Sequence, residues 1–327
     1  MLKIAADIET KRGHITCIGF AWSKTEAICI PFTCKENPAG YWTLDEEVAI
    51  VRKICELLTH PKVAVTGQNW HYDAQYIARH WGIVVQPKWL DTMLAQHIIF
   101  AGMPKTLDFI ASMYCDFYRY WKDDGKEANE KLNDEQGWVY NCDDNCYTYE
   151  CATVLDPMLD KTNLRAQYDQ LMRKWMPALR TMLRGTKINM ATKQAYAKKL
   201  MEAMREMEQW FEDVLGHSLN PRSPKQMPTL FFNDLLQKRV KGTSCDKDVL
   251  VAIGEAEPIL KPLVDNIALY RTMGVFLSTF VLAPLDWDNR LRCMYGLGGT
   301  ETYRLNSKED VFGFGTNLQN IPRNQED

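Results

Sequence analysis

The first thirty residues alternate apolar and polar positions in the way that is typical of β-strands. The segments that carry this pattern are LKIAADIE, HITCIGFAW and AICIPF, with short turns between them. We expect them to form an antiparallel meander. Asp7 and Glu9 stand at the end of its first strand.

The next hundred residues alternate between helical periodicity and a short buried strand. Apolar spacing predicts a helix over 44–58, with Thr43 as its N-cap. The run KVAVTGQ predicts a strand that ends in Gly67, and a helix is expected over 69–81. Asp91 is placed to cap a further helix with the sequence MLAQHIIF.

Residues 114–137 are polar, aromatic and rich in turn formers, so we expect a mobile loop there, followed by a helix start. From Trp138 to Leu159 the pattern is helical again, until Pro157 interferes.

Beyond Asp160 the sequence changes to long helices. We expect them over 164–183, 192–215 and about 259–280, and Pro177 is a possible kink in the first. A shorter helix should begin with Ser223 as N-cap and Pro224 in the first helical position. The change in pattern predicts a domain boundary near residues 155–165.

The composition limits the class of protein. The 327 residues are 46% hydrophobic, enough for two domains with their own cores. No apolar run approaches the roughly 20 residues that a membrane helix needs, and the N-terminus has no signal-peptide pattern. The ten cysteines form no C-x-x-C pair, which favours reduced thiols. We therefore expect a cytoplasmic protein without a membrane partner.

The two halves differ in charge. Residues 1–155 hold 15 Lys and Arg against 21 Asp and Glu, whereas residues 156–327 hold 24 against 21. An acidic half beside a mildly basic half suits a metal-dependent catalytic domain next to a region that binds a polyanion.

Candidate chemistry begins with Asp7 and Glu9. Side chains two residues apart on a strand point to the same face, while Ile8 between them points into the core. Two carboxylates on one face repel each other unless a cation lies between them, and hard oxygen ligands suit Mg²⁺ or Mn²⁺. Taken alone, the D-x-E triplet is more often ordinary surface charge.

Two further acidic positions stand on predicted helices. Asp73, in the segment that begins at Asn69, opens a helix, where it is either a metal ligand or a complement to the helix dipole. Tyr140 and Asp144 are spaced i and i+4, so their side chains share one helix face. Asp143 points about 100° away and is the weaker candidate. His71 is a further candidate ligand, although a lone histidine more often packs or faces solvent.

Together these elements resemble the DEDDy proofreading exonucleases, whose motifs are D-x-E, N-x-x-(Y/F)-D and Y-x-x-x-D in this order. The intervals of 66 residues from Asp7 to Asp73 and 71 residues from Asp73 to Asp144 suit such a domain. Other stretches resemble the version of this domain in family A DNA polymerases of bacterial or phage type, namely Asp91–Leu94, Thr106–Tyr114 and Trp121–Lys126.

The resemblance implies an α/β RNase H-like domain, with a mixed sheet flanked by helices, that removes nucleotides from DNA 3′ ends. It also implies a site with two Mg²⁺ or Mn²⁺ ions. Asp7 would bridge both ions, and Glu9 and Asp144 would complete one site. Asp73 would hold the other ion largely through water, and Tyr140 would orient the attacking water.

The second half resembles the thumb and the first part of the palm of family A polymerases. The matching stretches are 219–227, 244–250, 269–280, 299–307 and 316–322. The last contains N-L-Q-N-I-P, the most specific of them. The resemblance implies an exonuclease domain over 1–160, a mainly helical thumb over 161–285 and a truncated palm over 286–327.

By the same resemblance, residues of these motifs would contact DNA, and the types suit minor-groove acceptors that every base pair presents. They are Asn69, Arg304, Asn317, Gln319 and Asn320. For Arg304 alone the other interpretation is a surface salt bridge. The family usually has a glycine where this chain has Tyr303, so either the local backbone or the approach of DNA is expected to differ near Arg304.

The polymerase's own catalytic motifs would lie beyond Asp327. We therefore expect either a fragment of a longer chain or a split polymerase, completed by a C-terminal palm and fingers partner. Unpaired strand edges in the palm segment would favour such a partner.

Two other functions remain open. One is a catalytically silent DNA-binding or assembly module, and the other is an exonuclease that trims RNA, which would have to detect the 2′-OH. Aromatic side chains are candidates for base stacking or for the core, and they are Trp70, Tyr72, Tyr118, Tyr120 and Trp121.

Overall fold

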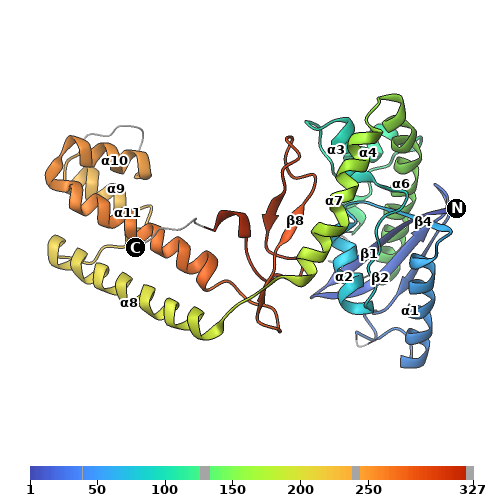
Figure 1. The fold of residues 1–327 in the computed structure, drawn as a ribbon, viewed down its shortest axis with the longest axis horizontal. Helices are drawn as coiled ribbons and strands as arrows, with labels where there is room; N and C mark the ends of the chain where they lie inside the picture. The colour runs from blue at the N-terminus through green and yellow to red at the C-terminus, as the bar shows by residue number, and fades with distance from the viewer. Residues whose placement is uncertain (39, 126–132, 238–243, 322–327) are drawn as a thin grey trace. The chain divides into compact units, whose positions relative to one another are not determined.

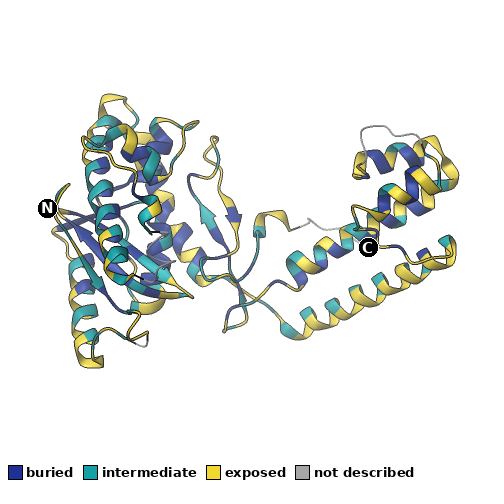
Figure 2. Cartoon of the chain, turned by 180° about the vertical axis from the view of Figure 1, so that it is seen from behind, coloured by how far each residue is buried: buried dark blue, intermediate teal, exposed yellow. Residues whose placement is uncertain are grey.

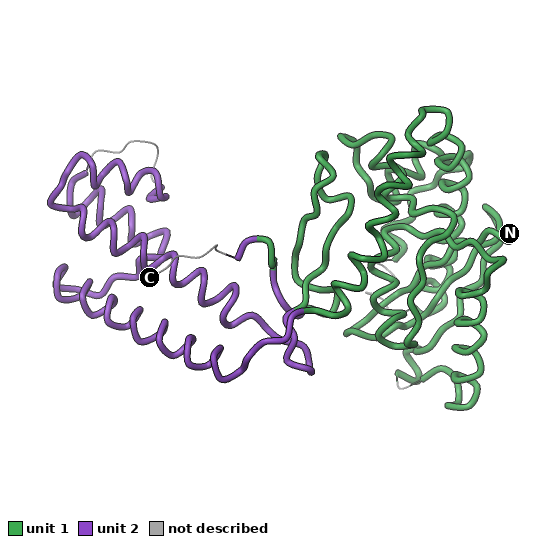
Figure 3. The backbone as a smooth tube through the Cα atoms, in the orientation of Figure 1, with its two compact units in different colours: residues 1–185, 292–313, 317–319 green, residues 186–291, 314–316, 320–327 purple. Residues whose placement is uncertain are grey.

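The computed structural model describes residues 1–38, 40–125, 133–237 and 244–321. The chain divides into two compact units, coloured separately in Figure 3. The first contains residues 1–185, 292–313 and 317–319, and the second contains the remainder. The predicted domain boundaries at 160 and 285 stay a prediction, because these units are defined by contacts and one of them is discontinuous in sequence.

The first unit is built on one mixed five-stranded sheet. Its strand order is β3-β2-β1-β4-β5, with bounds β1 (Leu2–Lys11), β2 (His14–Ala21), β3 (Ala27–Pro31), β4 (Val63–Gly67) and β5 (Leu90–Asp91). The pairs β1–β2 and β2–β3 are antiparallel, whereas β4 runs parallel to β1 and β5 parallel to β4. The predicted meander and α/β class are confirmed.

Helices of the first unit flank this sheet, and Figure 1 labels those named here. They are α1 (Leu44–Thr59), α2 (His71–Trp81), α3 (Thr92–Ile99), α4 (Leu107–Tyr114), α6 (Asp134–Lys161) and α7 (Arg165–Arg184). Helix α6 covers the face of the sheet that carries Asp7, since Asn141 donates a hydrogen bond to that carboxylate. Helix α1 packs its apolar residues over the opposite face, beside Ile4.

The predicted caps of this unit are present. Thr43 and Glu46 form a reciprocal capping box at the start of α1. Asp91 caps α3, because its carboxylate accepts a hydrogen bond from the Leu94 amide at 3.1 Å. These contacts satisfy amides that the first turn of a helix leaves unpaired.

Two predicted helix bounds need correction. Helix α2 begins at His71 and not at 69, because Asn69 has a left-handed φ of 56°, which no helix tolerates. Helix α6 starts at Asp134, where the Asn133 side chain accepts from the Gln136 amide, and it continues through Pro157 to Lys161. Of the predicted mobile loop over 114–137, residues 126–132 lie outside the described residues.

The second unit is mainly helical. It contains α8 (Met190–Leu215), α9 (Gln226–Pro228), α10 (Lys247–Ala256) and α11 (Lys261–Phe276), with a short sheet of β6 (Thr186–Lys187) and β7 (Arg290–Leu291). Its core gathers side chains of these helices around Phe211, Phe231 and Ile267. Figure 2 shows α8 exposed along most of its length, and Phe211 is its one buried residue.

Two helix predictions in this unit also need correction. Ser223 does accept a hydrogen bond from the Gln226 amide, but the helix starts only at Gln226, so Pro224 lies in the preceding turn. The long helix expected to about residue 280 ends at Phe276, where the hydrogen-bond pattern widens to a π-helical turn over Leu277–Val281.

Residues 292–313 return to the first unit. They form the hairpin of β8 (Met294–Gly296) and β9 (Asn306–Lys308), and Met294 and Leu297 join the core of the sheet domain. Tyr76 of α2 donates a hydrogen bond to the Val311 carbonyl at 3.0 Å. The core of the first unit is therefore completed by a segment that is remote in sequence.

Two further expectations from composition can be compared with the structure. All ten cysteines carry free thiols. Among the helices of the described segments, we find none that is both long and apolar enough to cross a bilayer.

Candidate metal centre

Strand β1 presents two carboxylates to the same side of the sheet. Asp7 pairs in register with Gly19 and Glu9 pairs with Cys17, and the register shifts immediately after Glu9. Ile8 lies between them and is buried in the core. The strand alternation therefore holds Asp7 and Glu9 against helix α6 while Ile8 fixes the strand from the other face.

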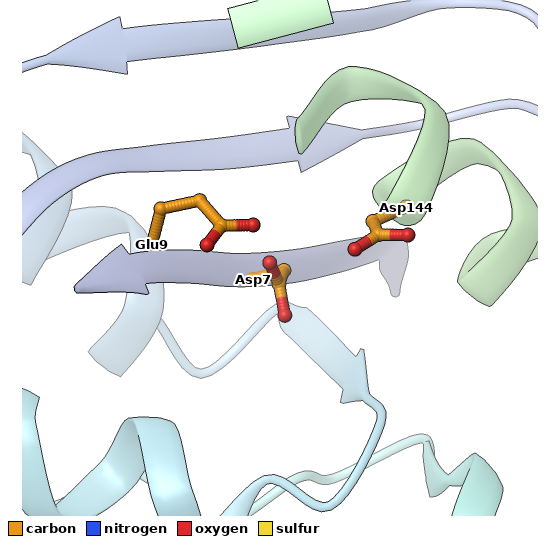
Figure 4. Close-up of side chains that lie close together, drawn as sticks. All are labelled: Asp7, Glu9 and Asp144. Carbon is orange, nitrogen blue, oxygen red and sulfur yellow. The ribbon is translucent and has the colours of Figure 1, made fainter. Parts of the chain in front are cut away.

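Helix α6 adds the third carboxylate. One carboxylate oxygen from each of Asp7, Glu9 and Asp144 lies within 4.8 Å of the other two. Figure 4 shows the three side chains converging, two from β1 and one from the helix. Asp144 is buried, whereas Asp7 and Glu9 are half-buried.

Asp73 is held beside this group but is not one of the three. It is the third residue of α2 and is buried, and its Oδ1 accepts a hydrogen bond from the Ile8 amide at 3.0 Å. This contact ties the start of α2 to β1. Asp73 is also close enough for its charge to raise the pKa of Asp7.

Tyr140 lies one helical turn before Asp144, as its spacing predicts. Burial, followed by the charge of Asp144, raises the pKa of the Tyr140 hydroxyl. The hydroxyl therefore stays protonated at neutral pH and acts as a hydrogen-bonding group, not as a base. Asp143 points elsewhere and pairs with Arg119 at 3.2 Å.

Two residues at this centre were missed by sequence reasoning. Lys122 contacts both Asp144 and Tyr140, and Asn141 donates to Asp7 Oδ2 at 3.0 Å. Lys122 lies in a polar segment without periodicity, so the sequence pattern does not predict which way its side chain points. Asn141 does carry a signal, because it lies three residues before Asp144 on the same helix.

Burial, followed by mutual repulsion, raises the pKa of three carboxylates at this centre. Burial, followed by the charge of Asp144, raises the pKa of Glu9 to about 7. Burial raises the pKa of Asp73 to about 8, although the Ile8 amide opposes the shift. Burial and then the charges of Asp73, Glu9 and Asp144 raise the pKa of Asp7 well above its usual range.

This donor set fits a divalent cation. Positive charge among these carboxylates favours the ionised forms of Asp7, Glu9 and Asp73, whose pKa values are raised without it. All the acidic ligand atoms are oxygens, which Mg²⁺ and Mn²⁺ prefer over thiolate or imidazole ligands. His71 is excluded from this set, because its ring stacks on Trp175 at 4.3 Å and bonds the Trp175 carbonyl.

Gly19 allows helix α6 to approach the sheet at this point. A Cβ atom on Gly19 would come within 2.1 Å of Asn141 Oδ1 and 2.3 Å of Asn145 Nδ2. We expect Gly19→Ala to lower the free energy of unfolding by about 1–3 kcal/mol, because both asparagines are buried and cannot move away easily.

Urea denaturation of Gly19→Ala measures this effect. The matched control is Gly102→Ala, since Gly102 is exposed and a Cβ there would meet nothing within 4 Å. An unchanged urea midpoint for Gly19→Ala would contradict the close approach of α6 to β2.

The predicted DNA contacts fall into two structural settings. Arg304 is exposed, and in the described part of the chain no carboxylate pairs with it, so the salt-bridge interpretation has no support there. Asn317 accepts a hydrogen bond from Ser307, and Gln319 donates to the Leu305 carbonyl at 2.9 Å. These two side chains therefore hold the Arg304 segment in place.

Tyr303 takes the left-handed conformation that a glycine would favour, with φ of 57°. Its ring packs edge-on against His97 of α3 at 5.0 Å. Glycine adopts this backbone conformation more readily than tyrosine does, and whether the backbone before Arg304 differs from that of the family stays a prediction. Asn320 is exposed, and Asn69 is half-buried at the start of α2.

The candidate stacking aromatics divide between core and surface. Trp70 and Trp121 are fully buried, so they cannot stack on a base without unfolding the core. Tyr72 donates to or accepts from the Thr10 hydroxyl at 2.7 Å. Tyr118 and Tyr120 are exposed and stay candidates.

Comparisons with known proteins agree with this arrangement. Residues 1–160 match the family model described as 3′-5′ exonuclease, and residues 190–327 match DNA polymerase family A. Exonuclease domains of this family generally use divalent metals, and the carboxylate cluster lies within the matched region.

Among curated relatives, the DNA polymerase I of Synechocystis sp. is 27% identical over 98% of this chain and 33% of its own length. The DNA polymerase I of Borreliella burgdorferi is 24% identical over 97% of this chain and 34% of its own length. The chain thus spans about a third of these relatives.

A solved structure shares the fold. It is the POL domain of Pol1 from M. smegmatis in complex with DNA primer-template and dNTP, which superposes with a TM-score of 0.69 at 19% identity. The match covers 99% of this chain and 53% of that one. The chain thus carries a 3′-5′ exonuclease domain over residues 1–160 and a DNA polymerase family A region over residues 190–327.

Proposed function

We propose that this chain is a metal-dependent 3′-5′ exonuclease that hydrolyses nucleotides from DNA 3′ ends. It would work as the proofreading part of a family A DNA polymerase. The observation that carries the proposal is the convergence of Asp7, Glu9 and Asp144 within 4.8 Å, with Asp73 beside them.

Asp7, Glu9, Asp73 and Asp144 would hold two ions, Mg²⁺ or Mn²⁺. When bound, such ions supply a hydroxide at neutral pH and neutralise charge on the attacking and leaving oxygens. Asp7 is central, because the charges of the other three carboxylates all raise its pKa. It is therefore the natural residue to be shared between two ions.

Tyr140 would orient the attacking water. Its hydroxyl stays protonated, so it can hold a water by hydrogen bonding without removing a proton from it. Asp144 lies one turn away on the same helix face, which places the water-orienting group beside a metal-binding carboxylate.

The DNA would be held by the polymerase-family motifs. Arg304 is the exposed cation among them, and Asn317 and Gln319 fix its segment. We propose that Arg304, Asn320 and Asn69 contact DNA directly. Asn317 and Gln319 would contribute their remaining hydrogen-bonding capacity.

The experiment uses a DNA single strand labelled at its 5′ end, so that shortening from the 3′ end gives a ladder. With Mg²⁺ or Mn²⁺ we expect stepwise shortening, and with EDTA none. A matched RNA strand should be degraded at least tenfold more slowly if DNA is the substrate. Binding without shortening under either metal would instead favour the catalytically silent module.

The polymerase reaction would need residues in addition to 1–327. Because the curated relatives are about three times as long as this chain, we propose that palm and finger residues outside 1–327 complete the polymerase, in the same polypeptide or in a partner. Primer extension by residues 1–327 alone would contradict this proposal.

A further inference from the structure

Lys122 contacts Tyr140 and Asp144, two of the residues that α6 contributes to the centre. Its ammonium donates to Asp144 Oδ1 at 2.7 Å and Oδ2 at 3.1 Å, and to the Tyr140 hydroxyl at 3.0 Å. The Lys122 side chain is only 25% exposed, so these contacts are not an ordinary surface ion pair.

The segment around Lys122 is anchored on α6 at both ends. Before it, the buried Trp121 stacks on Tyr147 at 4.1 Å and donates to Asp144 Oδ1 at 2.5 Å. After it, Gly125 packs beneath the Tyr140 ring, where a Cβ atom would come within 2.7 Å of the ring. The position of the ammonium is therefore fixed by packing as well as by charge.

These contacts determine the direction of the Tyr140 hydrogen bonds. An ammonium has three donors and no acceptor, so the Tyr140 oxygen accepts from Lys122. The hydroxyl proton of Tyr140 must then point away from Lys122, toward Asp144, which also hydrogen-bonds with this hydroxyl, or toward a water or a substrate oxygen.

The same contacts make the two carboxylate oxygens of Asp144 differ in their hydrogen bonding. Oδ1 accepts from both Trp121 and Lys122 at short distances, whereas the Lys122 contact to Oδ2 is longer. Oδ2 is therefore the oxygen with more remaining capacity for a cation.

We propose that Lys122 is a positioning residue of the exonuclease site, which directs the Tyr140 hydroxyl proton and holds Asp144 with Oδ2 toward the metal. The inference rests on the proposed exonuclease function. It adds one cation from a polar segment to a site otherwise made of carboxylates and a tyrosine.

The test compares Lys122→Met, Lys122→Arg and Lys24→Met in the full chain. Lys24 is the matched control, because it forms an exposed ion pair with Asp116 at 2.7 Å outside the carboxylate cluster. For Lys122→Met we expect kcat to fall about 10–100-fold while the KM for DNA changes less than about threefold. Lys122→Arg should recover part of kcat, and Lys24→Met should match the unmutated chain.

Two readouts separate positioning from a merely structural role. Mn²⁺ binding to the DNA-free protein should become up to about tenfold tighter in Lys122→Met, since a competing positive charge is removed. In a double-mutant cycle with Tyr140→Phe, the losses in kcat should not multiply, because Lys122 acts partly through Tyr140.

Each alternative gives a different result. A raised KM with unchanged kcat would show that Lys122 binds the DNA phosphate, and it would overturn positioning. Weaker Mn²⁺ binding together with a lower melting temperature would indicate a structural role, and unchanged kcat would overturn the proposal outright. If the unmutated chain leaves DNA intact, the proposed function itself fails, which this comparison reveals independently.

Discussion

Asp7→Ala is expected to lower the rate of 3′-terminal nucleotide removal by about 10³-fold or more. The charges of Glu9, Asp73 and Asp144 all act on Asp7, so its loss removes the proposed metal ligand that interacts with the other three carboxylates. A 10³-fold loss corresponds to about 4 kcal/mol of lost transition-state stabilisation. The measurement is single-turnover shortening of a labelled DNA strand in Mg²⁺.

Two companion variants make this result specific. Asp7→Asn keeps the shape of the side chain but not its charge, and it should lose activity almost as fully. Asp45→Asn, at an exposed acid in the first turn of α1, should retain full activity. If Asp7→Asn keeps more than a tenth of the rate, Asp7 is not a metal ligand of the reaction.

The second large effect is expected on stability in EDTA. The folded chain should lose about 2 kcal/mol of unfolding free energy as pH rises from 6.5 to 8.5. Glu9 and Asp73, with pKa values raised to about 7 and about 8, still hold protons in the folded state at pH 6.5. In the unfolded chain both are already ionised there, so the folded state alone must release protons.

This pH range is chosen to avoid the opposite effect of His71. Burial lowers the pKa of His71 to about 4, so its contribution to stability is lost as pH falls below about 6.5. Above pH 6.5, the titration of the carboxylates determines how the free energy of unfolding changes with pH. For a unit of this size, 2 kcal/mol corresponds to a fall in melting temperature of about 4–8 °C.

Thermal melts in EDTA at several pH values test the effect. Asp73→Asn should flatten the curve, because an amide does not titrate and its oxygen can still accept from the Ile8 amide. Saturating Mg²⁺ should raise the melting temperature more at pH 8.5 than at pH 6.5. A melting temperature that rises with pH in EDTA would contradict the raised pKa values of Glu9 and Asp73.

Much of the centre follows from short-range rules. Strand alternation places Asp7 and Glu9 on one face, and helical periodicity places Tyr140 and Asp144 on another, so the sequence predicts each pair separately. The capping roles of Thr43 and Asp91 are also predicted by rules that involve only neighbouring residues. What joins the pairs is the packing of α6 on the sheet at Gly19, which only the fold shows.

The misses have a common physical origin. Lys122 and Trp121 lie in a segment whose direction is set by burial and not by any repeat. The sequence leaves Trp70 open between base stacking and the core, and the structure places it in the core, where its ring nitrogen donates to the Val85 carbonyl. Asn69 lies outside helix α2 because its backbone is left-handed, a conformation that helix propensities do not predict.

The discontinuous first unit has a consequence for synthesis on the ribosome. Its sheet and helices are complete in sequence at residue 185, but Met294 and Leu297 enter their core about a hundred residues later. At about 5–20 residues per second, roughly 6–25 s separate residue 185 from residue 313. During that interval the nascent domain exposes the apolar surface that residues 292–313 later cover, so its final folding step must wait for translation of the second unit.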